Sequence, residues 1–205
     1  MSKEQILSAS KIKTFESCSW KYWCNYHLKL PQENNDGARR GTVCHLIFEL
    51  LVKARHKKHF DLIMEAQTLD ASPAVKRLVK KSLVKEEGYS EENYLLCEEM
   101  ILVGLDNDFY GAKGEVNSPE KEFLLESESP KYKIRGFIDK PVEYNKKLKI
   151  VDYKSSKSKF NKNELKSNVQ AMTYTLAAQT IWPKLKNVIV EFLFLRFPKS
   201  PSQQI

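Results

Sequence analysis

Gly136-Phe-Ile-Asp139 and Val151-Asp-Tyr-Lys-Ser-Ser156, separated by a short polar turn, decide the fold of this chain of 205 residues. Apolar and β-branched residues run through 134–142 and again through 148–153. Between them, 145–147 is Asn-Lys-Lys, a turn signal. The pattern predicts two antiparallel strands joined by a tight turn.

The register of this hairpin determines which side chains share a face. If the turn is centred between Asn145 and Lys146, Asp139 lies directly opposite Asp152. Side chains alternate along a strand, so Lys154 shares the face of Asp152. A turn one residue longer or shorter would put the two aspartates on opposite faces.

Paired aspartates beside a lysine suit metal-dependent hydrolysis. Opposed residues have Cβ atoms about 5 Å apart, so Asp139 and Asp152 can hold one divalent cation. Lys154 can then orient or deprotonate a water and offset charge on a phosphate. The structural alternative is a solvated hairpin with a surface salt bridge worth about 0–1 kcal/mol.

The neighbouring elements favour a mixed α/β fold. A short strand is expected over 120–126, a helix over 163–182, and a markedly apolar strand over 187–197. The last strand is hydrophobic enough to be covered on both sides. We therefore predict an α/β fold with a mixed central sheet, in the order α-β-β-β-α-β, and a helical N-terminal half.

Several separated motifs, taken together, carry a family resemblance. They are Ser8 to Cys18 followed by Trp20-Lys-Tyr-Trp23, Gly41-Thr-Val-Cys-His45, Gly136 to Asp139, Asp152 to Lys154, and Gln170 to Tyr174. With these motifs in this order, the chain resembles the PD-(D/E)XK nuclease superfamily, and within it the RecB-like and Cas4-like exonuclease domains. The resemblance implies a restriction-endonuclease-like core.

The resemblance also implies roles for individual residues. Histidines and aspartates such as His45, Asp139 and Asp152 ligate Mg²⁺ or Mn²⁺ in such nucleases, and a lysine such as Lys154 serves the attacking water. The carbonyl oxygen of Tyr153 is a further candidate ligand. Relatives place a glutamate at the start of the first core strand, and the sequence leaves this role open. The two candidates are Glu120 and Glu122.

Other residues are expected to contact DNA. The set combines the glutamine and tyrosine motif, arginines ahead of a helix expected to begin near Gly41, and polar, basic or aromatic residues elsewhere. These residues are Gln170, Tyr174, Arg39, Arg40, Ser10, Lys11, Trp20 and Ser155.

Each of these residues has a structural alternative. His45 lies in an apolar run and could be a core histidine bonded to Glu49. Gln170 has capping-box spacing from Ser167. Tyr174 and the aromatic residues of the first helix could serve packing alone.

Composition limits the remaining possibilities. A formal charge of +8 gives a surface that attracts polyanions. The length favours a single domain over 1–205, with a mostly helical part (1–118), a catalytic sheet core (119–197) and a tail or linker (198–205). No apolar run is long enough to span a membrane, so an intracellular location is expected, and a viral (phage) origin is compatible with it.

The cysteines test the subfamily. Some Cas4-like relatives bind an iron–sulfur cluster through one cysteine near the N-terminus and three near the C-terminus. Here the last cysteine is Cys97, so we predict no cluster.

The sequence therefore predicts a metal-dependent DNA nuclease, most simply an exonuclease acting on duplex ends or single strands in recombination, repair or replication. A recombination or replication protein is a possible partner. Two alternatives remain open at this point: an accessory protein that binds DNA ends without cutting, and an RNA-processing nuclease.

Overall fold

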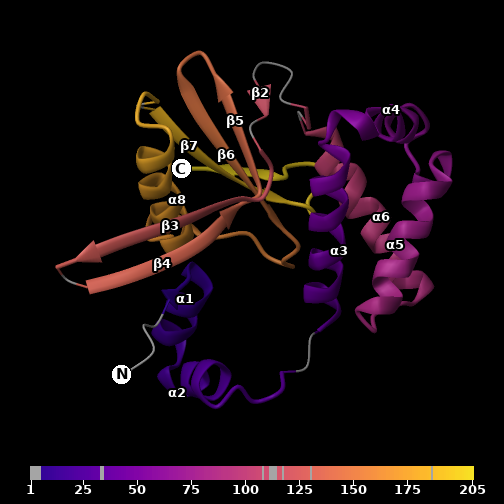
Figure 1. Cartoon of the computed structure of the whole chain (residues 1–205). Helices are drawn as coiled ribbons and strands as arrows, with labels where there is room; N and C mark the ends of the chain where they lie inside the picture. Colours follow the sequence, from indigo (N-terminus) through magenta and orange to yellow (C-terminus); the bar gives the residue numbers. More distant parts are fainter. Residues whose placement is uncertain are drawn as a thin grey trace.

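The computed structural model describes residues 6–32, 35–107, 109–110, 115–116, 118–129, 131–185 and 187–205. Its helical segments, shown in Figure 1, are α1 (Ala9–Ser17), α2 (Ser19–Tyr22), η1 (Trp23–His27), α3 (Asp36–Leu51), η2 (Ala54–His56), α4 (Lys57–Ala66), η3 (Leu69–Ala71), α5 (Pro73–Lys85), α6 (Glu91–Asp106), α7 (Lys162–Lys166) and α8 (Val169–Ile181). Its strands are β1 (Ile6–Leu7), β2 (Glu115–Val116), β3 (Lys121–Glu128), β4 (Lys131–Ile138), β5 (Lys140–Tyr144), β6 (Lys147–Lys154), β7 (Asn187–Phe194) and β8 (Ser202–Gln204).

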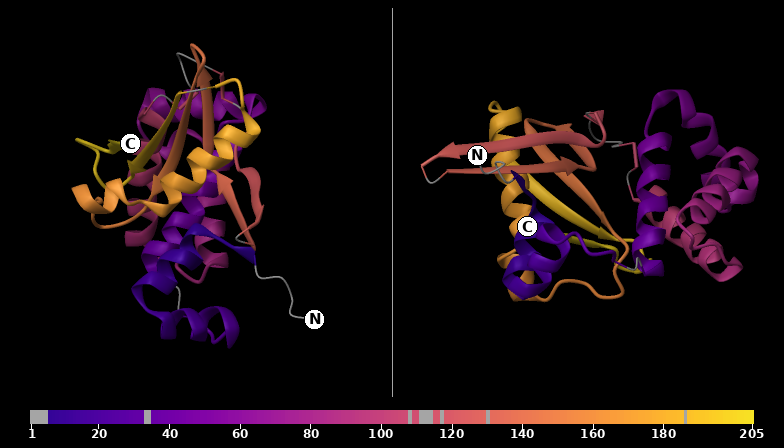
Figure 2. Two further views of the ribbon diagram at one scale, coloured as in Figure 1. Left: turned by 90° about the vertical axis from the view of Figure 1, so that its left-hand side faces the viewer. Right: turned by 60° about the horizontal axis from the view of Figure 1, so that its bottom comes forward.

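The described strands form two sheets between helical layers. One sheet has the order β1-β4-β3, and the other has the order β2-β5-β6-β7-β8. β6 and β7 are parallel, whereas β5 and β8 run antiparallel to their neighbours. Helix α8 covers one face of the larger sheet and α3 to α6 lie on the other side (Figures 1 and 2). The predicted mixed α/β fold with a helical N-terminal half is confirmed.

Alternation along the central strands builds a separate core on each face. Val151 and Tyr153 pack toward α3 to α6, whereas Leu148 and Ile150 pack toward α8. Phe192 and Phe194 of β7 are fully buried on the α8 side. Burying an apolar side chain of this size contributes roughly 1.5–3 kcal/mol, so both layers hold the central strands firmly in place.

The hairpin register agrees with the sequence prediction. Lys140 pairs with Val151 and Tyr144 pairs with Lys147. Asn145 and Lys146 both have positive φ, 48° and 61°, as a two-residue turn of the mirror-image type requires.

The strand predicted over 134–142 is divided, and this corrects the prediction of one continuous hairpin and one central sheet. The chain bends at Asp139, where it leaves β4 in the smaller sheet and enters β5 in the larger one. Glycine at 136 is needed because an added Cβ would collide with the ring of Phe123 on the paired strand. Because the chain passes from one sheet to the other at this bend, Asp139 lies where the two sheets meet.

Several predicted boundaries are wrong. Helix α3 begins at Asp36 with Asn35 as its N-cap, and not near Gly41. The helix predicted over 163–182 is two helices, because Asn168 caps a new one, α8. The segment 198–205 is not an open tail, since β8 within it pairs with β7.

Candidate metal centre and active site

The end of β6 fixes the position of helix α3. Ser155 donates a hydrogen bond from Oγ to the carbonyl oxygen of Gly37, at 3.2 Å. One turn further along α3, a Cβ added to Gly41 would lie 2.7 Å from Ser155 Oγ, so glycine permits this close approach. The contact brings His45, one turn beyond Gly41, to Tyr153 on β6.

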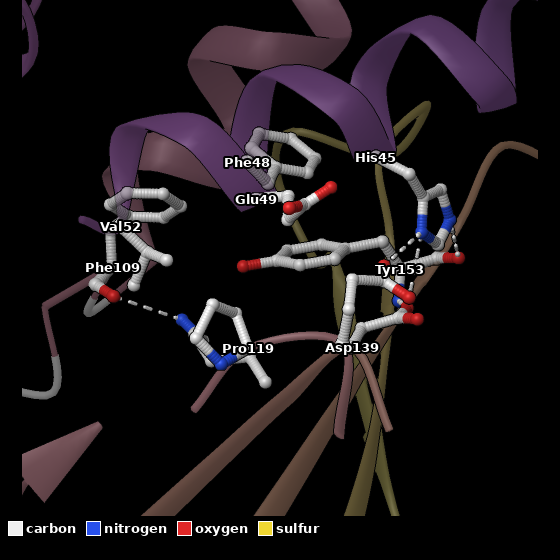
Figure 3. A pocket seen from close by; sticks show the side chains of 10 residues that line it. His45, Phe48, Glu49, Val52, Phe109, Pro119, Asp139 and Tyr153 are labelled. Carbon is white, nitrogen blue, oxygen red and sulfur yellow. Dashed lines mark hydrogen bonds and ion pairs between the residues drawn. The ribbon is translucent and has the colours of Figure 1, made fainter. Parts of the chain in front are cut away.

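Three side chains from separate segments meet at this point, and we call them the donor cluster. His45 Nδ1 lies 3.4 Å from Asp139 Oδ2 and 3.9 Å from Glu120 Oε1. One ligand atom from each residue lies within 4.8 Å of the other two. Figure 3 shows His45 and Asp139 facing each other beside Tyr153.

The backbone of Tyr153 orients two members of the donor cluster. Its N–H donates to Asp139 Oδ2 at 2.9 Å, and its carbonyl oxygen lies 3.1 Å from His45 Nε2. With Nδ1 facing the carboxylates, Nε2 donates its proton to this carbonyl, as the outer nitrogen of a metal-binding histidine commonly does. The carbonyl oxygen expected as a metal ligand therefore orients His45 here.

The aromatic ring of Tyr153 anchors this backbone. The ring lies beneath α3 against Phe48, with 4.2 Å between the ring centroids (Figure 3). Glu49, the alternative partner considered for His45, forms an ion pair with Lys53 at 3.0 Å. His45 thus interacts with the carboxylates of Asp139 and Glu120, and not with Glu49.

The electrostatics of the donor cluster favour a positive charge. Burial raises the pKa of Asp139, and the charge of Asp152 raises it further. Burial lowers the pKa of His45, but the charges and hydrogen bonds of Asp139 and Glu120 outweigh it and raise that pKa to about 10. Both shifts mean that the cluster retains protons when no other cation is present.

The donor set fits a divalent cation. Two carboxylates and an imidazole are ligands that Mn²⁺ accepts, and Mg²⁺ favours the carboxylate oxygens. Glu120 has a φ of 52°, a left-handed conformation that residues with a Cβ rarely adopt. Strain of this kind concentrates at functional positions, which favours Glu120 as the acid at the start of the first core strand. Glu122 instead forms an ion pair with Arg135.

A second group, the lysine network, lies beside the donor cluster and consists of Asp152, Lys154, Gln170 and Tyr174. Asp152 Oδ1 accepts hydrogen bonds from Gln170 Nε2 and Tyr174 OH, both at 2.7 Å. Lys154 Nζ lies 2.5 Å from Asp152 Oδ2 and donates to Gln170 Oε1 at 2.7 Å. The four side chains hold one another in fixed positions.

Strand alternation and helix spacing explain this network. Asp152 and Lys154 point to the α8 side of β6, as their predicted shared face requires. Gln170 and Tyr174 are four residues apart on α8, so they lie on one face of the helix and contact Asp152 and Lys154 together. Asn168, and not a capping box at Ser167, satisfies the start of α8, which leaves the Gln170 side chain free for Asp152.

Asp152 is adjacent to the donor cluster but is not one of its three members. Its negative charge acts on both His45 and Asp139. The structure thus places the predicted pair of aspartates together, with Glu120 completing the cluster.

The lysine network and two members of the donor cluster, His45 and Asp139, open into one groove of about 1020 Å³. Its other walls come from the start of α1, from β4 and from α8. Among the predicted contact residues, those that line it are Ser10, Lys11, Gln170 and Tyr174. Lys13, on the same helix as Lys11, also lines it, and the lining residues not anticipated from the sequence include Arg135 and Phe137.

The remaining predicted DNA contacts are placed differently. Arg40 is buried and bonds to Asn93 of α6, and Arg39 forms an ion pair with Asp36 at 3.2 Å. Both lie within α3 and not ahead of it, so the position at a helix start that favoured them as DNA contacts is wrong. Ser155 bonds to α3, and Trp20 is exposed outside the groove lining.

Lys140, which follows Asp139 directly, is a buried lysine beside the site that the sequence did not reveal. It is 2% exposed, donates to the carbonyl oxygen of Phe109 at 3.3 Å and lies near the Tyr153 ring. A lysine in a strand normally indicates solvent, and no pattern marks this one as buried.

A carboxylate and histidine cluster beside a fixed lysine, carried by a mixed α/β fold, defines a metal-binding site of the nuclease type. The family model described as the PD-(D/E)XK nuclease superfamily matches residues 6–204, and the chain belongs to this superfamily of nucleases, whose members use divalent metals. No curated protein matches the chain. Within the part that the structure describes, no helix is both long and apolar enough for a membrane span.

Proposed function

We propose that this protein is a deoxyribonuclease of the RecB-like and Cas4-like group that hydrolyses phosphodiester bonds with Mg²⁺ or Mn²⁺, acting from DNA ends in recombination, repair or replication. The observation that carries the proposal is the placement of the donor cluster and the lysine network at one groove. The order of motifs along the chain supports the subgroup.

In this proposal His45, Glu120 and Asp139 hold the cation, and Asp152 adds its charge beside them. The bound cation would activate the attacking water and stabilise negative charge on the phosphate. Asp139 is held for this task by the Tyr153 N–H, and His45 by the Tyr153 carbonyl oxygen.

Lys154 places its ammonium group at the reacting phosphate. Asp152 and Gln170 fix its Nζ at 2.5 and 2.7 Å, so the group needs little reorganisation when charge develops. The ammonium can orient the water and offset the charge of the pentavalent phosphate. Tyr174 and Gln170 act here through Asp152 and Lys154, and this replaces the direct DNA contact expected for them.

The test uses linear duplex, linear single-stranded and covalently closed circular DNA, with Mg²⁺, Mn²⁺ or chelator. Asp152→Ala serves as the inactive comparison, and RNA of matched sequence serves as competitor. Metal-dependent loss of linear DNA alone is the expected result.

Other outcomes separate the alternatives. Cutting of circles would indicate an endonuclease, and preferential loss of RNA would indicate an RNA-processing enzyme. Binding to ends without any metal-dependent cleavage would contradict the proposal and favour an accessory role.

A further inference from the structure

The groove contains an exposed aromatic residue next to the donor cluster. Phe137 lies on β4, two residues before Asp139, and 45% of it is exposed. Among the described residues of the β3–β4 hairpin, the other large apolar side chains with comparable exposure are Leu124 and Tyr132, and neither lines the groove. Phe137 is thus an apolar surface at the position where substrate would lie.

Neighbouring side chains hold the Phe137 ring in place. The Arg135 guanidinium carbon lies 5.5 Å from the ring centroid. Arg135 forms an ion pair with Glu122, which pairs directly with Phe137 across the sheet. The ring therefore lies against this ion pair in the wall of the groove.

Basic side chains line the groove and can contact the backbone of a nucleic-acid strand. They are Lys11, Lys13, Arg135 and Lys154, and outside the site the lining also contains Glu16 and Glu164. Two residues along an extended strand span about 7 Å, so Phe137 lies within reach of the base belonging to a phosphate held at Asp139. Cations that contact the backbone and an aromatic ring that contacts a base are the usual elements of single-strand binding.

We propose that Phe137 is a base-stacking residue, and that the substrate strand reaches the donor cluster unpaired, with the base beside the scissile phosphate stacked on this ring. The inference rests on the proposed nuclease function and adds a substrate form to it. In a duplex the faces of the bases are covered by their neighbours, so the ring can stack only on a single strand or a frayed end.

The test combines three protein variants with an altered DNA strand. Phe137→Leu keeps an apolar side chain but removes the aromatic face, whereas Phe137→Tyr keeps the face. Leu124→Ala is the matched control, because Leu124 is 48% exposed and lies on the same face of the hairpin, opposite Arg135. The DNA is a single-stranded oligonucleotide in which one abasic nucleotide is moved stepwise past the cleavage site.

Binding is measured in chelator by fluorescence anisotropy, and KM and kcat are measured with Mn²⁺. For wild type, one abasic position should weaken binding roughly 5- to 150-fold, the loss of one stacked base. Phe137→Leu should weaken binding to the intact strand by a similar factor and be insensitive to that abasic position. Phe137→Tyr and Leu124→Ala should behave like wild type.

Three outcomes would overturn the inference while leaving the nuclease intact. Phe137→Leu could bind and cleave the intact strand as wild type does, or its effect and that of the abasic position could multiply independently. Loss of binding by Phe137→Tyr as large as that of Phe137→Leu would equally exclude stacking. Failure of wild type to bind or cleave any strand would instead contradict the proposed function itself.

Discussion

The donor cluster and the lysine network lie side by side, yet they differ in how completely their charges are neutralised. In the lysine network Gln170 and Tyr174 donate hydrogen bonds to Asp152 Oδ1, and Oδ2 has the ion pair with Lys154 but no hydrogen bond. In the donor cluster two carboxylates face one imidazole, and the pKa of His45 rises to about 10. The lysine network contains its own cation, Lys154, whereas the donor cluster still attracts positive charge.

This difference separates two tasks of a hydrolytic site. A closed network keeps its geometry through the reaction, which suits the placement of an ammonium group. A cluster of like charges is unfavourable until a cation neutralises it, which suits metal binding. Substitutions in the two groups should therefore have different effects on metal binding and on cleavage.

The largest effect is expected from Asp139→Asn, in the donor cluster. This change removes the carboxylate that contacts His45 and the Tyr153 N–H, so cleavage should fall at least about a thousand-fold. The rise in Tm that Mn²⁺ gives the wild-type protein should disappear as well. Oligonucleotide cleavage and thermal unfolding with and without Mn²⁺ measure both.

Glu126→Gln is a suitable control, because Glu126 forms an ion pair with Lys133 on the same hairpin, away from the cluster. It should retain both cleavage and the metal response. A Mn²⁺ response that survives in Asp139→Asn would show that the cation binds elsewhere.

Lys154→Arg should have the next largest effect and leave metal binding intact. The guanidinium keeps a positive charge beside Asp152 but changes its shape and does not release a proton, so cleavage should fall roughly 100- to 10,000-fold. The Mn²⁺-dependent rise in Tm should match that of wild type.

Lys154→Met completes this comparison. It removes the charge that faces buried Asp152, so the free energy of unfolding should fall by about 1–3 kcal/mol in addition to the loss of cleavage. Wild-type cleavage by Lys154→Arg would show that any cation suffices at this position.

Glu120→Gly should have opposite effects on two quantities: it should raise the stability of the metal-free protein and lower its affinity for Mn²⁺. Glycine tolerates the φ of 52° at this position, so unfolding without metal should become more difficult by up to about 1 kcal/mol. Affinity for Mn²⁺ should fall at least roughly tenfold, a loss seen even when outer partners of metal ligands are removed. Calorimetric titration with Mn²⁺ measures the affinity.

Glu122→Gln is the informative comparison for Glu120, since the sequence could not choose between the two glutamates. Glu122 pairs with Arg135, and Mn²⁺ affinity should be unchanged in this variant. The reverse pattern of affinities would assign the ligand role to Glu122.

The parts of this site that depend on local rules could be predicted from sequence. The polar turn at Asn145 and Lys146 fixes the hairpin register, and alternation along β6 then puts Asp152 and Lys154 on one face. The apolar strand over 187–197 likewise indicated burial on both sides, and β7 is buried in this way.

The parts that depend on tertiary contacts could not be predicted. The bend at Asp139 looks like continuous strand in the sequence, because a change of sheet leaves no break in the apolar pattern. Glu120 and Glu122 have equivalent spacing, and only the folded structure puts Glu120 Oε1 3.9 Å from His45 Nδ1 while Glu122 pairs with Arg135. Arg40 is buried and donates a hydrogen bond to Asn93 of a distant helix, and no local pattern indicates that contact.

The smallest effect on cleavage is expected from a substitution of Glu191. This carboxylate is buried in the larger sheet, has hydrogen-bond and ion-pair partners, and takes no part in the site. Ser202 and Gln204 of β8 donate to it, and Lys149 Nζ lies 3.2 Å away. Burial raises the pKa of Glu191, but these hydrogen bonds and the lysine charge outweigh it, so the pKa lies below its usual value of 4.5. Glu191 thus resembles Asp152 in its surroundings but not in its role.

A lowered pKa means that this carboxylate stabilises the fold above about pH 4.5 and loses that contribution as pH falls through the lowered value. Glu191→Gln should lower the free energy of unfolding at pH 7 by about 1 kcal/mol and flatten its decline in acid. Urea unfolding between pH 3 and pH 7 measures this, and cleavage at pH 7 should be retained. A large loss of cleavage would mean that a neutralised carboxylate outside the site also controls the chemistry. The contrast between the donor cluster and the lysine network would then no longer explain which carboxylates cleavage requires.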